Sequence, residues 1–318
     1  MRITTWNARG LNAPSKKRLI KQHLKSFNLE ITLIQETKLN KIEGIKLSKM
    51  LGFWNSIFLE ADGTSGGLGM IWNPKKINLK YLVNSSNWMC TSVQSLKSDL
   101  KFSLINVYGP NSLIKKKVVW EELGLVISEH KDNPIILGGD FNTILNLNEK
   151  VGGSQHLAPS SLDFKIWIDN HNLLEIPSNN GIFMWNNKRK DNAYIAEKLD
   201  RFFLVGNLSS FNKDVQSSIL PFAGSDHFPV CLEISEPSKP SRNPFKCEKM
   251  WFHDHKFLEL VKIWWTQANF EGSKMFTFIS KLKALKENIL KWNREHFNNI
   301  LERNWKPKKS LKILIRIL

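Results

Sequence analysis

Two short stretches decide how this chain folds, Gly138-Gly139-Asp140-Phe141-Asn142 and Ser225-Asp226-His227. The first follows the apolar run 134–137 and the second precedes the apolar run 228–232, and each run predicts a short buried strand. Both stretches therefore put carboxylate, amide or imidazole groups at strand ends, where α/β folds collect ligand-binding groups. Burying a carboxylate without compensation costs on the order of several kcal/mol, so these groups predict a binding site.

The composition indicates a globular protein. The 318 residues are 42% hydrophobic and 11% aromatic, which excludes a disordered chain, and the length suffices for one large domain or two. The three cysteines show no Cys-x-x-Cys spacing, which disfavours a disulfide framework and a zinc knuckle and indicates a reducing compartment. We see no secretory signal and no stretch of about 20 apolar residues, so we expect an intracellular protein that is neither secreted nor membrane-bound, with a nuclear location left open.

The positive charge is concentrated near the C-terminus. The formal net charge is +17, and residues 239–318 hold 18 Lys and Arg against 7 Asp and Glu, a net +11. Such asymmetry favours a polyanionic partner such as nucleic acid over the alternative, a merely solvated surface.

The order of elements predicts packed sheets covered by helices, followed by a separate tail. Short apolar strands alternate with helical stretches at 14–27, 115–129 and 161–171, and strand-like runs follow one another between 67 and 108. The polar, proline-rich segment 235–244 reads as a linker. We therefore predict a domain over 1–235, a linker over 236–250 and a basic helical connector over 251–318, whose uncapped apolar end we interpret as truncated. The Trp and Phe stripe of the connector is expected to form core or partner contacts rather than to stack on bases.

A set of polar residues at predicted strand ends carries the chemistry. Its carboxylates, amides, phenol and imidazole lie in motifs spread along the first 235 residues: Asn7, Glu36, Tyr108, Asp140, Asn142, Asp200, Asp226 and His227. Taken singly, each has a structural explanation, such as a turn residue or a surface carboxylate. Together they suit a hard divalent ion with oxygen ligands, Mg²⁺ or Mn²⁺ rather than zinc, and a bound phosphate.

The order of these motifs resembles that of the endonuclease/exonuclease/phosphatase superfamily, the deoxyribonuclease I-like proteins. The motifs are Trp-Asn, Gln-Glu-Thr, Val-Tyr-Gly-Pro, Gly-Asp-Phe-Asn, Leu-Asp-Arg and Ser-Asp-His, and the resemblance covers residues 1 to about 235. The stretches 5–12 and 199–202 look more narrowly like the endonuclease domain of plant LINE-type (non-LTR) retrotransposons. The resemblance implies an α+β fold, a four-layer α/β/β/α sandwich of two mixed sheets, here with a helical C-terminal tail.

The resemblance also implies a reaction, Mg²⁺-dependent hydrolysis of DNA to leave a 3′-hydroxyl. Glu36 would bind the metal with Asn7 and Asp226. Asp140 would deprotonate the attacking water, although His227 remains an alternative base. Asn142 and Tyr108 would hold the phosphate, and His227, oriented by Asp200, would stabilise the transition state. DNA is the expected partner, the basic tail leaves RNA open as a second one, and the oligomeric state is unknown.

Two other functions remain open from the sequence. The same fold hosts phosphomonoesterases, and a catalytically inactive nucleic-acid-binding relic would keep the fold and the basic tail. One departure from the family pattern bears on activity, because relatives often read Phe-Thr-Trp where this chain has Phe183-Met184-Trp185. The missing hydroxyl puts efficiency in doubt rather than fold.

Overall fold

The computed structural model describes residues 1–61, 66–131, 133–154, 156–206, 213–221, 224–236, 251–252, 254, 256–270 and 274–297. The chain divides into two compact units, Met1–Lys239 and Pro240–Leu318. Residues 237–250 lie outside the described residues; they include most of the predicted linker and Cys247.

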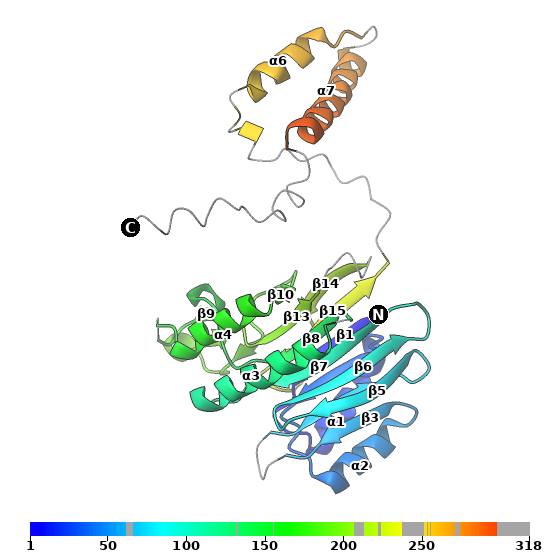
Figure 1. The fold of residues 1–318 in the computed structure, drawn as a ribbon, viewed down its shortest axis with the longest axis vertical. Helices are drawn as coiled ribbons and strands as arrows, with labels where there is room; N and C mark the ends of the chain where they lie inside the picture. The colour runs from blue at the N-terminus through cyan, green and yellow to red at the C-terminus, as the bar shows by residue number, and fades with distance from the viewer. Residues whose placement is uncertain are drawn as a thin grey trace. The chain divides into compact units, whose positions relative to one another are not determined.

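Two six-stranded mixed sheets form the centre of the first unit (Figure 1). The first sheet has the order β14-β15-β1-β2-β4-β3 and the second has the order β10-β13-β8-β7-β6-β5. The strands of the first sheet are β1 (Arg2–Asn7), β2 (Ile31–Gln35), β3 (Asn55–Leu59), β4 (Leu68–Trp72), β14 (Asp214–Ile219) and β15 (Val230–Ser235). Those of the second are β5 (Ile77–Asn84), β6 (Trp88–Ser95), β7 (Lys101–Tyr108), β8 (Ile135–Asp140), β10 (Leu174–Glu175) and β13 (Asp200–Val205). A small third sheet joins β9 (Lys150–Val151), β12 (Ala196–Glu197) and β11 (Trp185–Asn186).

Helices cover the outer face of each sheet. The helices of the first unit are α1 (Pro14–Ser26), α2 (Lys41–Leu51), α3 (Leu113–Glu129) and α4 (Pro159–Asn170), with short 3-10 turns at Leu147–Glu149 and Asp191–Ala193. One apolar cluster fills the space between the sheets, a second packs α1 and α2 on the first sheet, and a third packs α3 and α4 on the second. This is the predicted four-layer α/β/β/α sandwich, so the expected fold class is confirmed.

The central strands bring the polar motifs to one end of the sandwich. β1 runs parallel to β2, with Asn7 opposite Gln35, and β7 runs parallel to β8, with Tyr108 opposite Asp140. β13 runs antiparallel to β8, so its first residue, Asp200, also lies opposite Asp140. Parallel strands end at the same edge of a sheet, and this edge of both sheets therefore collects the candidate site.

Polar side chains also link the two sheets just below this edge. The side-chain amide of Gln35 donates to Thr5 Oγ1 at 2.9 Å and to Asn106 Oδ1 at 2.6 Å. Asn106 in turn donates to the carbonyl oxygens of Ile34 and Gly69, at 3.2 and 3.0 Å. These buried hydrogen bonds fix the spacing of the sheets where the site begins.

Most differences from the sequence-based expectations fall on polar or short elements. Helix α2, strand β3 and most of strand β14 were not among the elements expected from the sequence. The burial pattern of β14 is mixed and the strand lies at a sheet edge, so its sequence lacks the apolar run that marks the central strands. Cys90 and Cys231 are free and buried.

The described part of the second unit is a pair of helices, α6 (Phe257–Gln267) and α7 (Lys274–Phe297). Trp251, Phe257, Ile289 and Trp292 are buried against one another, and Trp251 Nε1 donates to Asn293 Oδ1 at 2.9 Å. Part of the aromatic stripe therefore forms a small core, as expected, while Phe278 and Leu282 remain exposed. Within the residues that the structure describes, we find no helix both long and apolar enough to cross a bilayer.

Candidate active site

The candidate site forms where six strands begin or end. Asn7 ends β1, Glu36 follows β2, and Tyr108 and Asp140 end β7 and β8. Three further residues come from the same edge: Asp200 at the start of β13, and Asp226 and His227 just before β15. Asn142 follows in the loop after β8.

The carboxylate of Glu36 accepts hydrogen bonds from residues of both sheets. Its Oε1 accepts a hydrogen bond from Asn7 Nδ2 at 3.1 Å and one from the hydroxyl of Tyr108 at 2.8 Å. Asn7 Nδ2 also donates to Asp140 Oδ2 at 2.8 Å, and its Oδ1 accepts the backbone N–H of Arg9 at 3.0 Å. Burial, and then the nearby charge of Glu36, raise the pKa of Tyr108, so the phenol stays protonated and acts as a donor.

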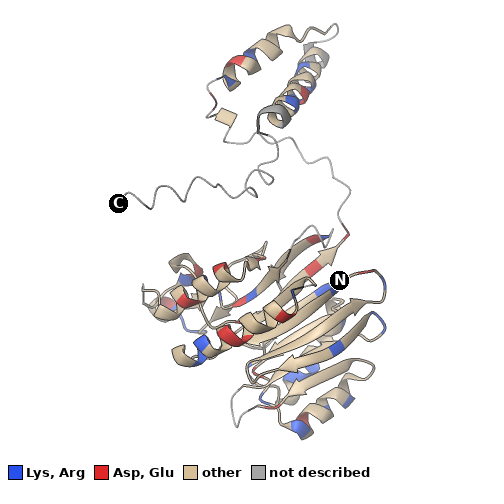
Figure 2. Ribbon diagram, viewed as in Figure 1, with Lys and Arg blue, Asp and Glu red and all other residues tan. Residues whose placement is uncertain are grey.

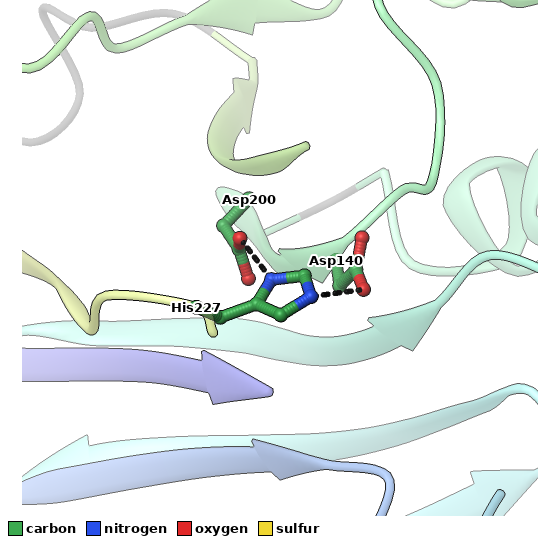
Figure 3. A group of neighbouring side chains, drawn as sticks. All are labelled: Asp140, Asp200 and His227. Atoms are coloured by element: carbon green, nitrogen blue, oxygen red, sulfur yellow. Dashed lines mark hydrogen bonds and ion pairs between the residues drawn. The ribbon is translucent and has the colours of Figure 1, made fainter. Parts of the chain in front are cut away.

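His227 lies between two fully buried aspartates (Figure 3). Its Nδ1 is 2.8 Å from Asp200 Oδ2, and its Nε2 is 3.9 Å from Asp140 Oδ2. Burial lowers the pKa of His227, but the charges of Asp200 and Asp140 and the hydrogen bond outweigh it and raise the pKa to about 9. Burial raises the pKa of Asp200 to about 6, against the opposing effect of His227. At pH 7 the pair is therefore an imidazolium held by a carboxylate.

Two groups of side chains could hold a metal ion, and their chemistry differs. Asp140, Asp200 and His227 are close enough to converge on one ion. An imidazolium cannot ligate a cation, however, and Nδ1 of His227 is already engaged by Asp200. The better-suited pair is Glu36 and Asp226, because both lie beside a cationic group already, the guanidinium of Arg9.

Asp226 is held in place by three neighbouring side chains. Its Oδ2 accepts a hydrogen bond from Trp185 Nε1 at 3.0 Å and lies 3.3 Å from Arg9 Nη2, and its Oδ1 lies 3.2 Å from the hydroxyl of Ser225. Burial opposes ionisation, but Trp185, His227 and Arg9 together lower the pKa of Asp226. This carboxylate is thus ionised at neutral pH.

A tight turn presents Asn142 beside Asp140. The backbone N–H of Asn142 donates to Asp140 Oδ1 at 2.9 Å, its side-chain amide donates to the carbonyl of Gly109 at 2.7 Å, and its φ is +48°. The buried ammonium of Lys116 supports the turn from α3, donating to the carbonyl of Asn142 at 2.6 Å. A Cβ on Gly109 would lie 2.3 Å from the carbonyl oxygen of Phe141, so only glycine lets the turns after β7 and β8 meet.

The structure thus brings together all the site residues expected from the sequence, although the amide group of Asn142 and the amide oxygen of Asn7 are directed to backbone groups. The Asn142 amide faces Gly109, and the Asn7 oxygen faces the backbone of Arg9. The roles assigned to these residues remain predictions.

Sequence reasoning missed three residues that support the site, Arg9, Trp185 and Lys116. Arg9 and Trp185 stood inside quoted motifs, but the site residues that their side chains contact are far away in sequence. Arg201, beside Asp200, is anchored by Glu149 and Glu175 at 2.5 and 2.9 Å and so fixes the start of β13. Met184, at the departure from the family pattern, packs in the core between the sheets.

Comparison with known proteins agrees with the fold and the motifs. Residues 4–227 match the model of the Endonuclease/Exonuclease/phosphatase family. The fold is similar to that of the endonuclease domain of TRAS1, a telomere-specific non-LTR retrotransposon, with a TM-score of 0.57 and 13% identity over 73% of this chain and 97% of that one. It is also similar to the AP endonuclease LMAP from Leishmania major, with a TM-score of 0.59 and 16% identity over 74% of this chain and 88% of that one. The 3′-5′ exonuclease NExo from Neisseria meningitidis gives a TM-score of 0.57 and 18% identity over 74% of this chain and 100% of its own.

The fold is that of a family whose members hydrolyse phosphodiesters or phosphate esters. The chain belongs to the endonuclease/exonuclease/phosphatase family, since the family model covers most of its length.

Proposed function

We propose that this protein is a Mg²⁺- or Mn²⁺-dependent DNA endonuclease of retroelement origin that leaves a 3′-hydroxyl. One observation carries the proposal: Glu36 and Asp226, distant in sequence, both contact a single cationic side chain beside the Asp140–His227–Asp200 cluster. The likeness in fold to the TRAS1 endonuclease domain, the order of the motifs and the basic tail favour DNA as the substrate.

The residues present fit a hard divalent ion. Glu36 and Asp226 offer carboxylate oxygens, the donor type that Mg²⁺ and Mn²⁺ prefer, and the guanidinium between them marks a position where positive charge is stabilised. We assign Glu36 and Asp226 as ligands, with Asn7 as a third donor if its amide oxygen turns toward them. When bound, the ion would neutralise charge on the phosphoryl oxygens.

The other side chains then have separate tasks. Asp140, held by Asn7 and by the backbone of Asn142, accepts the proton of the attacking water. Protonated His227 donates from Nε2 to the phosphate oxygens, which gain charge in the transition state, while Asp200 keeps the ring oriented. Tyr108 and Asn142 would donate to the phosphate, Tyr108 after its hydroxyl turns from Glu36 and Asn142 through its second amide hydrogen. The alternative, with His227 as the base, needs a neutral imidazole, which its raised pKa disfavours.

A phosphomonoesterase is the second candidate, and one comparison favours it. NExo is also described as a 3′ phosphatase, bound to a product DNA hairpin, with a TM-score of 0.57 and 18% identity to this chain. The third candidate, an inactive nucleic-acid-binding relic, would bind DNA without cleaving it.

Three substrates separate these candidates. The full chain, with Mg²⁺ and with EDTA, is given supercoiled plasmid, a DNA hairpin ending in a 3′-phosphate, and p-nitrophenyl phosphate. We expect nicked plasmid whose ends a DNA polymerase extends directly, which requires a 3′-hydroxyl. Phosphate release from the hairpin or from p-nitrophenyl phosphate without nicking would favour the phosphomonoesterase, and DNA binding without any hydrolysis would favour the relic.

A further inference from the structure

One arginine lies between the two carboxylates assigned to the metal. Arg9 Nη1 is 3.5 Å from Glu36 Oε1, and Arg9 Nη2 is 3.3 Å from Asp226 Oδ2. The side chain of Arg9 is 48% exposed, whereas those of Glu36 and Asp226 are 9% and 17% exposed. The guanidinium therefore reaches in from the surface and neutralises two largely covered anions at once.

The backbone around Arg9 is fixed from several sides. The flanking N–H groups of Ala8 and Gly10 donate to the carbonyl oxygens of Gln35 and Glu36, at 3.0 and 2.7 Å. Lys16, on α1, donates to the carbonyl oxygens of Ala8 and Arg9, at 2.6 and 3.1 Å. Arg9 itself has a φ of +48°, a left-handed conformation that is uncommon outside glycine and is often retained at functional sites. The turn thus holds the Arg9 backbone beside the metal-assigned carboxylates.

We propose that Arg9 is a built-in counter-cation that holds Glu36 and Asp226 together when no metal is bound and competes with the divalent ion for them. The inference rests on the proposed function, which assigns these carboxylates to the metal. A guanidinium and a divalent ion repel each other, and the same carboxylate oxygens cannot serve both at full strength. Metal binding therefore includes the cost of displacing Arg9, and Arg9 lowers the metal affinity of the free protein.

Lys38 supplies a matched control. Its Nζ lies 3.9 Å from Glu36 Oε2, so it carries the same charge near the same site but contacts only one of the two carboxylates. Arginine differs because its planar fork of donors can contact two anions simultaneously. Arg9→Gln and Lys38→Gln remove equal charge from similar left-handed positions, with φ of +48° and +53°.

The test measures Mn²⁺ binding to the full chain without DNA, by calorimetry and by the loss of the free-ion paramagnetic resonance signal. We expect Arg9→Gln to bind Mn²⁺ about three- to tenfold more tightly than wild type, because two partly exposed ion pairs no longer have to be broken. Lys38→Gln should change the affinity by less than about twofold, and Arg9→Lys should lie between wild type and Arg9→Gln.

Thermal unfolding gives a second readout. Without divalent ions, Arg9→Gln should unfold at a lower temperature than wild type, because the guanidinium no longer offsets the repulsion between Glu36 and Asp226. Saturating Mn²⁺ should remove that difference. Equal affinities for Arg9→Gln and Lys38→Gln, or weaker binding by Arg9→Gln, would overturn the inference. Glu36→Gln distinguishes failure of the inference about Arg9 from failure of the proposed metal site. If Glu36→Gln binds Mn²⁺ with wild-type affinity, the assignment of the metal site itself is wrong.

Discussion

The imidazole of His227 lies between two buried carboxylates, and its charge follows from that position. With a pKa of about 9 for His227 and about 6 for Asp200, both groups are charged at pH 7. The hydrogen bond between them fixes the ring, so that Nε2 faces the side of the site where Asp140 lies. A fixed cation of this kind stabilises a phosphate that gains negative charge, without reorganisation at the moment of reaction.

Glu36 and His227 should differ in what they do for the metal. Glu36→Gln removes a charged oxygen ligand, and we expect Mg²⁺ affinity to fall by at least about tenfold. His227→Ala should leave Mg²⁺ affinity within about twofold of wild type while lowering the single-turnover nicking rate by about 10²–10³-fold, the usual cost of losing one transition-state donor. Calorimetric titration and single-turnover kinetics measure the two quantities separately. An equal loss of Mg²⁺ affinity in both variants would contradict the separate roles.

Among the secondary-structure elements, the sequence predicts those that contain a clear apolar run. The central strands and the polar residues at their ends could be read directly, because buried strands are continuous apolar runs that stop at Gly, Asn or Asp. Strand β14 could not be predicted, because it is a polar edge strand and its sequence resembles that of a loop. Arg9 could not be assigned either, because its function depends on the left-handed turn and on Glu36 and Asp226 meeting in space. The roles of Asn7 and Asn142 depend on which way each amide points, which no pattern encodes.

Gly139, in β8, should be intolerant of any side chain. A Cβ there would lie 1.9 Å from the carbonyl oxygen of Val107, a backbone atom of the paired strand β7. We expect Gly139→Ala to lower the free energy of unfolding by at least about 1–3 kcal/mol, the usual cost of overpacking, and to displace Asp140. Gly44, in α2, is the control: its Cβ would meet Phe58 at 3.5 Å, an ordinary contact, so Gly44→Ala should stabilise the protein by about 0.5–1 kcal/mol. Urea denaturation of both variants measures the two changes in the free energy of unfolding. An unchanged free energy of unfolding in Gly139→Ala would contradict the close packing of β8 against β7.

At the scale of the whole molecule, the two units differ in charge. Figure 2 shows acidic and basic residues interspersed over the helices and loops of the first unit, while its strands are mostly uncharged. The second unit carries the C-terminal excess of Lys and Arg, and its helices bury their own small aromatic core. Because this core already occupies Trp251, Phe257 and Trp292, we expect the second unit to contact nucleic acid through its lysines rather than through these rings.

The exposed lysines of α7 should therefore add affinity that does not depend on sequence. Replacing Lys283, Lys286 and Lys291 by Gln in the full chain should lower the slope of log affinity against log salt by about 0.9 for each phosphate that the protein no longer neutralises. The control replaces three exposed lysines in the region of β5–β7, Lys80, Lys97 and Lys101, with the same decrease in charge. DNA affinity measured at several salt concentrations compares the two. Identical slopes for the α7 variant and wild type would leave the second unit as a structural connector.

The most direct test of the proposed nuclease site is nicking of supercoiled plasmid by wild type and by Asp140→Asn, each with Mg²⁺ and with EDTA. Asp140→Asn keeps the shape of the side chain but removes the proton acceptor from the centre of the site. We expect wild type to convert the plasmid to open circles only with Mg²⁺, and Asp140→Asn to be at least about 100-fold slower. Nicking in EDTA, or nicking by Asp140→Asn at the wild-type rate, would contradict the claim that this cluster is a metal-dependent nuclease site.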